Sequence, residues 1–173
     1  MSGEVTDKPN TKERPATRRP LAEIVADLSR EIHPSRLQTK TQGGQTLTFI
    51  PWFQAVQYLD YYAPGWCYEL RKVESVQATV YTKLKGPDRK DILDPATGLA
   101  KTIPSLQTSV ILVARITIPA AEGEIYREAS ALEVIGTAGY GDAATNAESA
   151  ALRRAASKFG LGLYLYDKKQ RER

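Results

Sequence analysis

Three long strand-like runs occupy the middle of the chain, and no helical pattern separates them. They cover residues 66–84, 106–118 and 124–135, and each is rich in β-branched residues or alternates apolar with charged side chains. Consecutive strands that are joined without helices are typical of an antiparallel meander. The sequence therefore predicts an α+β fold built on a three-stranded antiparallel sheet.

The two connections between these runs differ in length. Residues 119–123 are short enough for a tight turn. Residues 85–105 are long for a hairpin loop and contain Gly-Pro, Asp-Pro and Thr-Gly pairs that break regular structure. We expect this longer connection to be a mobile excursion from the sheet.

A helix is predicted directly after the third run. Thr145 and Glu148 have the T-x-x-E spacing of a capping box, in which each side chain bonds a free backbone amide at the start of a helix. Strong helix formers follow, and Gly160 stands where a left-handed C-terminal cap is expected, after about fourteen residues. Packing of this helix across the sheet gives a β-β-β-α core.

The predicted helix has one face that can pack and another that is cationic. At 100° per residue, the packing face contains Leu152, Ala156 and Phe159. Arg154 and Lys158 lie nearly opposite, and Arg153 is about a quarter-turn from Arg154. Such a cationic face is typical of any solvated helix, so its meaning depends on the residues around it.

Shorter elements are predicted before the sheet. An N-terminal helix is indicated by apolar residues at helical spacing and ends soon before Pro34; these residues are Leu21, Ile24, Val25, Leu28 and Ile32. A small hairpin joins residues 36–41 to 45–50 through Gly43-Gly44. Pro51 then opens a second helix that runs to about Tyr62. Its packing residues are predicted to be Phe53, Val56, Gln57, Tyr58 and Leu59.

Residue counts exclude several kinds of site. One cysteine cannot form an intrachain disulfide, and one cysteine with one histidine cannot make an ordinary zinc site. We interpret Cys67 as a buried small hydrophobe and His33 as a helix-end residue. No metal and no cofactor is expected.

The net charge of +4 lies at the two ends of the chain. Residues 1–20 carry five Lys or Arg against three Asp or Glu, and residues 167–173 carry four against two, which leaves residues 21–166 neutral. We expect a disordered tail over 1–20, one domain over 21–167 and a charged tail over 168–173. No apolar run is long enough for a membrane span, and residues 1–20 lack the apolar centre of a signal peptide, which favours a cytoplasmic protein without membrane contact.

Two further motifs favour structural roles. Gly136, Gly139 and Gly141 precede the basic helix with G-x-x-G-x-G spacing, which fits a flexible strand-to-helix turn better than a phosphate-binding loop. Tyr164 and Tyr166 could stack on bases, but in alternation with leucines they are expected to pack on a sheet.

Two separate stretches resemble one known family. The run AESAALRRAASKFGLGLYLYD resembles the end of the annealing domain in the Rad52 superfamily of single-strand DNA annealing proteins, including its bacterial DdrA-like members. The run QTLTFIPW, a following helix and then GWCYEL are similar to the hairpin, helix and Gly-Trp strand that open the same domain. The resemblance covers about residues 36–167, and it implies the same β-β-β-α order.

The resemblance also implies a DNA-binding surface. In that family the basic helix lines a groove that holds single-stranded DNA by its phosphates, and Arg153 and Arg154 match its adjacent basic pair. Lys158 follows Ser157, which replaces a further family arginine. Two other family arginines fall at Gln54 and Leu163, so the DNA path is expected to differ in detail. The predicted DNA-binding residues are Arg153, Arg154 and Lys158.

The function implied is single-stranded DNA binding and strand annealing without catalysis, in homologous recombination and DNA double-strand break repair. Because one domain spans few nucleotides, a homo-oligomeric ring or helical filament is expected, with a single-strand-binding protein as a further candidate partner. A bacterial or phage-encoded, nucleoid-associated protein is the expected source.

Two alternatives remain open at this point. A metal-dependent nucleic-acid enzyme could use Asp88, Asp91 and Asp94 as ligands, although these carboxylates lie in the predicted excursion and lack a histidine. A protein-binding oligomeric scaffold of the same fold is the other. Cleavage of nucleic acid that depends on a divalent metal would favour the enzyme. Charge reversal at Arg153 and Arg154 that left DNA binding unchanged would favour the scaffold.

Overall fold

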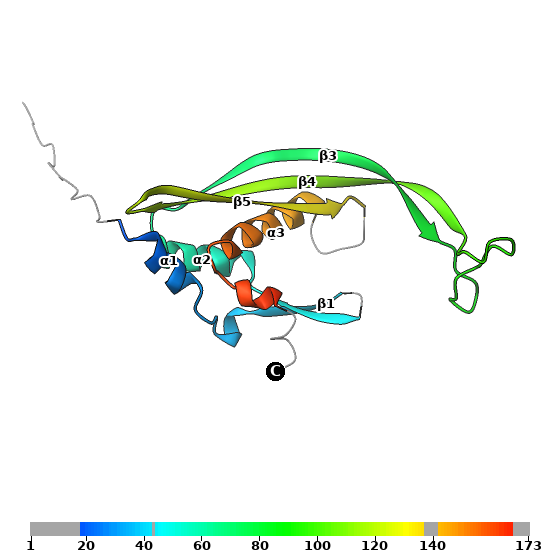
Figure 1. The fold of residues 1–173 in the computed structure, drawn as a ribbon, viewed down its shortest axis with the longest axis horizontal. Helices are drawn as coiled ribbons and strands as arrows, with labels where there is room; N and C mark the ends of the chain where they lie inside the picture. Colours follow the sequence, from blue (N-terminus) through cyan, green and yellow to red (C-terminus); the bar gives the residue numbers. More distant parts are fainter. Residues whose placement is uncertain (1–17, 43, 137–141, 168–173) are drawn as a thin grey trace, which may run out of the picture.

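The computed structural model of the protein describes residues 18–42, 44–136 and 142–167 (Figure 1). Most of the predicted N-terminal tail, the charged tail over 168–173, Gly139 and Gly141 lie outside the described residues. The described chain begins with α1 (Leu21–Leu28), the 3-10 turn η1 (Pro34–Arg36), β1 (Gln38–Gln42), β2 (Gln45–Phe49) and α2 (Trp52–Tyr62). It continues with β3 (Cys67–Lys83), β4 (Thr102–Ala120), β5 (Gly123–Val134), α3 (Ala143–Ser157) and the 3-10 turn η2 (Leu163–Tyr166).

The predicted sheet is confirmed as an antiparallel β3-β4-β5 meander followed by α3. Its central strand starts earlier than the sequence indicated, because Thr102 already pairs with Lys83. Strand β5 pairs with β4 only from Ser109 onward, so the outer parts of β3 and β4 form a two-stranded arm (Figure 1). Residues 84–101 close this arm and contain two isolated bridges, Lys85 to Asp91 and Leu93 to Ala100, so the excursion is shorter than predicted and includes paired residues.

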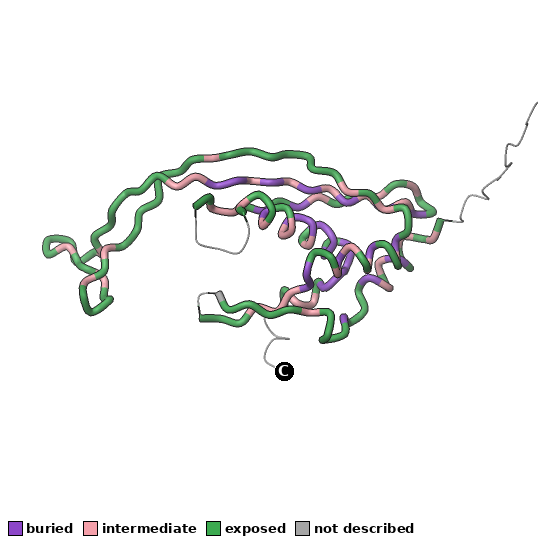
Figure 2. Tube along the Cα trace, turned by 180° about the vertical axis from the view of Figure 1, so that it is seen from behind, coloured by how far each residue is buried: buried purple, intermediate pink, exposed green. Residues whose placement is uncertain are grey.

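One face of the sheet carries the helices. Along β4, alternate residues from Val110 to Ala120 are buried, as the period-2 geometry of a strand requires when one face is covered (Figure 2). Alanines of α3 rest on this face and bring the helix close to the sheet; Ala147, Ala151 and Ala155 are fully buried. The predicted packing residues of α3 are also confirmed, because Leu152, Ala156 and Phe159 are buried in the core.

Helix α3 begins three residues before the predicted capping box. Asp142 is the N-cap, and its Oδ1 accepts a hydrogen bond of 2.7 Å from the backbone N–H of Thr145. The prediction of Thr145 as the cap was wrong because an aspartate with the same chemistry stands three positions earlier. Gly160 does adopt a positive φ of 102°, two residues beyond the C-cap Lys158.

The elements before the sheet have the predicted order, with several corrections in detail. Helix α1 ends at Leu28, although Ile32 is still buried in the core beyond its end. The hairpin β1–β2 turns at Gly44 with a φ of 77°. Arg19, within the predicted tail, is bound to Asp27 and to the carbonyl oxygen of Tyr62.

Three predicted side-chain placements were wrong. Phe53 is 42% exposed and Gln57 is exposed, because α2 buries Ala55 and Leu59 on its other side. Cys67 is exposed, because its position on β3 points to the sheet face without helices. Residues 163–166 form the 3-10 turn η2 and do not alternate on a sheet, since Gly162 enters the turn with a left-handed φ of 62°. Among the described residues, no helix is long and apolar enough to cross a membrane.

Candidate nucleic-acid interface

Arg153 lies where α3 faces the β1–β2 hairpin. Its guanidinium carbon is 5.1 Å from the ring centroid of Phe49, the last residue of β2, which is a cation–π contact. The side chain is half-buried, and burial lowers its pKa from the usual value for arginine. Tyr166 and Glu133 oppose this effect, whereas the neighbouring Arg154 adds to it. The guanidinium stays charged, and reduced solvent screening strengthens its attraction for an anion.

A second cation belongs to the hairpin face that Arg153 contacts. Lys40 pairs with Leu47 across the hairpin, and Gln38 pairs with Phe49. Directly opposed residues and residues two apart along a strand share one face, so Lys40 and Phe49 lie on the same side of the hairpin. Lys40 is exposed. Arg153 of α3 thus contacts the Phe49 ring, and Lys40 adds a second cation to the hairpin face that bears this ring.

Arg154 and Lys158 point in another direction, toward the free edge of the sheet. Arg154 Nη1 donates a hydrogen bond of 2.8 Å to the carbonyl oxygen of Ser130 on β5. Lys158 Nζ donates to the carbonyl oxygen of Glu128 on the same strand. Strand β5 is an edge strand that pairs with β4 on one side only, so α3 reaches its unpaired side. The three predicted cations are therefore divided between two directions on α3.

The positions at which the chain departs from the resembled family have clear places in the structure. Ser157 is buried and donates to the carbonyl oxygen of Arg154, so it stabilises the helix end. Leu163 is exposed. Gln54 accepts a hydrogen bond of 2.8 Å from Arg36 Nη1, so a guanidinium from η1 stands beside that position of α2.

The acidic residues of the excursion are engaged in local contacts. Asp91 pairs with Lys85 and Lys83, and hydrogen bonding to Lys85 and then Lys83 lowers its pKa. Asp88 accepts from the backbone N–H of Lys90, and Asp94 accepts from that of Ala96. Within the described ranges, no group of three His, Cys, Asp or Glu side chains could hold a metal ion. Nothing in this geometry favours the metal-dependent alternative.

Sequence reasoning missed Lys40, Phe49 and Arg36. Lys40 and Phe49 belong to a short polar hairpin, and the alternation of that hairpin predicts which residues share a face but not which face meets α3. Arg36 was missed because its importance depends on contacts with α2, eighteen or more residues away. His33 was expected at the end of the N-terminal helix, but that helix ends at Leu28. His33 instead precedes η1, where its Nδ1 accepts a hydrogen bond from the Ser35 N–H.

Two curated plant proteins are similar to this chain. "DNA repair RAD52-like protein 1, mitochondrial" from Arabidopsis thaliana is 32% identical over 148 residues, which cover 86% of this chain and 68% of that protein. "DNA repair RAD52-like protein 2, chloroplastic" from the same plant is 33% identical over 151 residues. That match covers 86% of this chain but 61% of the relative, so the chain spans less than two thirds of its length.

These relatives correct the expected source and location. The prediction of a cytoplasmic protein encoded by a bacterium or phage is wrong, because both relatives are plant proteins whose names assign them to the mitochondrion and the chloroplast. The residues that carried the resemblance form the fold and its cationic helix, and such residues contain no information on compartment.

A family model described as "Rad52/22 family double-strand break repair protein" matches residues 21–173. This range contains the hairpin, the three-stranded sheet and α3 with its cations. The resemblance that was based on two short stretches thus extends across the whole described domain. The chain belongs to the Rad52/22 family of double-strand break repair proteins.

Proposed function

We propose that this protein binds single-stranded DNA and anneals complementary strands in homologous recombination and double-strand break repair, without a catalytic step. The observation that carries the proposal is the half-buried Arg153 guanidinium on the Phe49 ring, with Lys40 on the same hairpin face. A DNA phosphate bound there would gain two cations from two different elements. Membership of a family named for double-strand break repair supports the biological role.

The chemistry of such a surface is electrostatic. Arg153, Arg154 and Lys158 would pair with phosphates, which leaves the bases free, so that base pairing supplied by the DNA decides which strands join. Arg154 and Lys158 each use one donor on a β5 carbonyl and retain further donors for an anion. No proton transfer or nucleophile is needed for annealing.

Assembly is part of the proposal. Helix α3 has 15 residues and is therefore about 22 Å long, so one domain contacts only a short stretch of DNA. A homo-oligomeric ring or filament would align these surfaces along a longer strand. The β3 edge of the sheet is available for contact with a neighbouring copy, whereas β5 has two carbonyls already bonded to α3.

The test is binding of fluorescent oligo-dT over a series of salt concentrations, with the mass of the complex recorded. Arg153→Gln should weaken binding and reduce the slope of log affinity against log salt by about 0.7, the value for one phosphate contact with a single strand. Lys90→Gln is the matched control, because Lys90 is 84% exposed and lies in residues 84–101 at the end of the arm.

The outcomes separate clearly. A large oligomer that anneals complementary strands and loses affinity with Arg153→Gln, but not with Lys90→Gln, would support the proposal. Equal effects of the two substitutions would assign binding to net charge alone. A folded protein that does not bind oligo-dT at low salt would refute the proposed function.

A further inference from the structure

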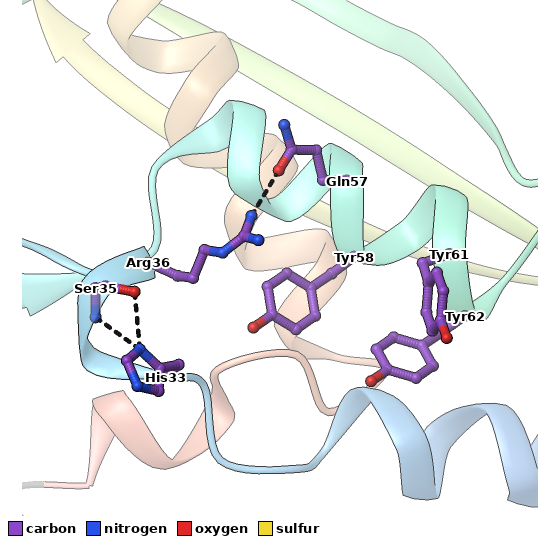
Figure 3. A pocket seen from close by; sticks show the side chains of 7 residues that line it. All are labelled: His33, Ser35, Arg36, Gln57, Tyr58, Tyr61 and Tyr62. Carbon is purple, nitrogen blue, oxygen red and sulfur yellow. Dashed lines mark hydrogen bonds between the residues drawn. The ribbon is translucent and has the colours of Figure 1, made fainter.

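A pocket separate from the Arg153 contact lies between η1 and α2 (Figure 3). Its volume is about 550 Å³, within the usual range for sites of small ligands. Figure 3 shows that its polar side comes from the α1–β1 connection and that its aromatic side comes from α2. The lining residues that matter here are His33, Arg36, Gln57, Tyr58, Tyr61 and Tyr62.

Arg36 brings an uncompensated positive charge to this pocket. Its Nη1 donates hydrogen bonds of 2.8 and 2.9 Å to the amide oxygens of Gln54 and Gln57, which are neutral. Four other arginines do pair with carboxylates: Arg19, Arg30, Arg71 and Arg115. Among the described residues, Arg36 has no carboxylate within ion-pair distance. The two glutamines orient the guanidinium and leave its Nε and Nη2 donors for an anion.

The opposite wall offers an aromatic surface that is open to solvent. Tyr61 is 78% exposed, and its ring meets Tyr62 edge-to-face at a centroid distance of 4.8 Å. Tyr58 stacks on Tyr62 at 6.1 Å, so the rings support one another along α2. Phe53, also exposed, lies eight residues before Tyr61 on α2, about 12 Å away along the helix axis and about 80° around it. Exposed rings that are held by neighbouring rings are suited to stacking on bases.

His33 adds an imidazole ring that Ser35 holds in place. Its Nδ1 accepts a hydrogen bond of 3.3 Å from the backbone N–H of Ser35 and lies 2.8 Å from Ser35 Oγ. The pocket therefore combines a guanidinium, an imidazole and tyrosine hydroxyls with an exposed aromatic ring.

We propose that this pocket binds one nucleotide of a single-stranded nucleic acid, with its phosphate on Arg36 and its base stacked on Tyr61. The proposal rests on the proposed function and adds a second contact point on η1 and α2, elements that do not carry Arg153. A planar base can stack on the exposed Tyr61 ring, and a phosphate can pair with the Arg36 guanidinium. An acidic peptide would pair with the guanidinium but would not stack on the ring.

Photocross-linking tests the proposal directly. Oligo-dT containing 5-iododeoxyuridine is bound to the full-length protein and irradiated, and the cross-linked peptides are identified by mass spectrometry. A cross-link within residues 58–62 is expected, with lower yield for Arg36→Gln. Tyr61→Ala should lower oligonucleotide affinity by about 5-fold to 150-fold, the range for one stacked base. Tyr81→Ala is the matched control, because Tyr81 is 66% exposed on the arm.

The proposal and the general function fail in different ways. Binding that depends on Arg153 but gives no cross-link on α2, and is unchanged by Tyr61→Ala and Arg36→Gln, would overturn the pocket site alone. Absence of any binding by the folded wild type would overturn both. Protection of the pocket by a glutamate-rich peptide, without any effect of oligo-dT, would assign it to a protein partner and overturn the proposal.

Discussion

Gly160 follows the end of α3 and packs against the end of α1. A Cβ atom added there would lie 2.0 Å from Ser29 Oγ, 3.2 Å from Ser29 Cβ and 3.3 Å from the carbonyl oxygen of Val25. The residue also has a φ of 102°, a left-handed conformation that side chains disfavour. Gly160→Ala therefore combines a backbone cost with a steric one.

Both costs can be given a size. The left-handed conformation costs about 1–2 kcal/mol for a residue with a Cβ. Extra volume in a packed site costs about 1–3 kcal/mol more. Rotation of Ser29 relieves only its Oγ contact, because its Cβ and the Val25 carbonyl remain in place. The expected loss is about 2–5 kcal/mol, or a fall in Tm of roughly 10 °C for a domain of this size.

Thermal and urea unfolding measure the stability that Gly160→Ala loses. A control variant, Gly98→Ala, separates the backbone cost from the steric cost. Gly98 has a φ of 69° and no atom within 4 Å of an added Cβ, so Gly98→Ala carries the backbone cost alone. Adding Ser29→Ala to Gly160→Ala should restore part of the lost stability, since it removes the closest contact. Equal losses for Gly98→Ala and Gly160→Ala, with no restoration, would refute the steric reasoning.

Three further predictions concern single hydrogen bonds and rings. Tyr164→Phe should lower the free energy of unfolding by about 1–2 kcal/mol, because the Ile32 N–H loses the hydroxyl that accepts its 3.1 Å bond; an unchanged urea midpoint would contradict this. Asp142 has a lowered pKa because the backbone N–H of Thr145 donates to its carboxylate, so its contribution to stability is present above the unfolded pKa of about 3.9 and is lost as pH falls through the lower folded value. Asp142→Asn keeps the cap but cannot titrate, and its Tm should fall less steeply in acid than that of the wild type. Phe49→Leu removes the ring beneath Arg153 and should weaken oligo-dT binding about 2-fold to 5-fold, less than Arg153→Gln does; an equal or larger loss would show that the hairpin had shifted.

The sheet and α3 could be predicted because their signals are local. Strand alternation, turn glycines and helix formers depend on neighbours in sequence, and the burial of alternate β4 residues follows from the same period. The cap of α3 was misplaced because Asp142 and Thr145 are both good N-cap residues at helical spacing. The burial of α2 was misjudged because exposed Phe53 and buried Leu59 have equal hydrophobic character, and only the position of the other helices separates them.

The site could be predicted only in part for a similar reason. The basic helix was visible as a pattern, but the division of its cations between Phe49 and the β5 carbonyls depends on where the hairpin and strand edge lie. Arg36 gave no signal, since its contacts with Gln54 and Gln57 cross from η1 to α2. Long-range contacts of this kind are set by the fold and not by local spacing.

The bonds from Arg154 and Lys158 to β5 have a consequence for the entropy of binding. Long basic side chains ordinarily lose rotamer freedom when they bind an anion, at a cost of about 0.5–1.5 kcal/mol each. Here both chains are already ordered on the carbonyl oxygens of Ser130 and Glu128. Folding has removed part of that freedom, so an anion bound by these two side chains, as proposed, would meet groups that are already ordered.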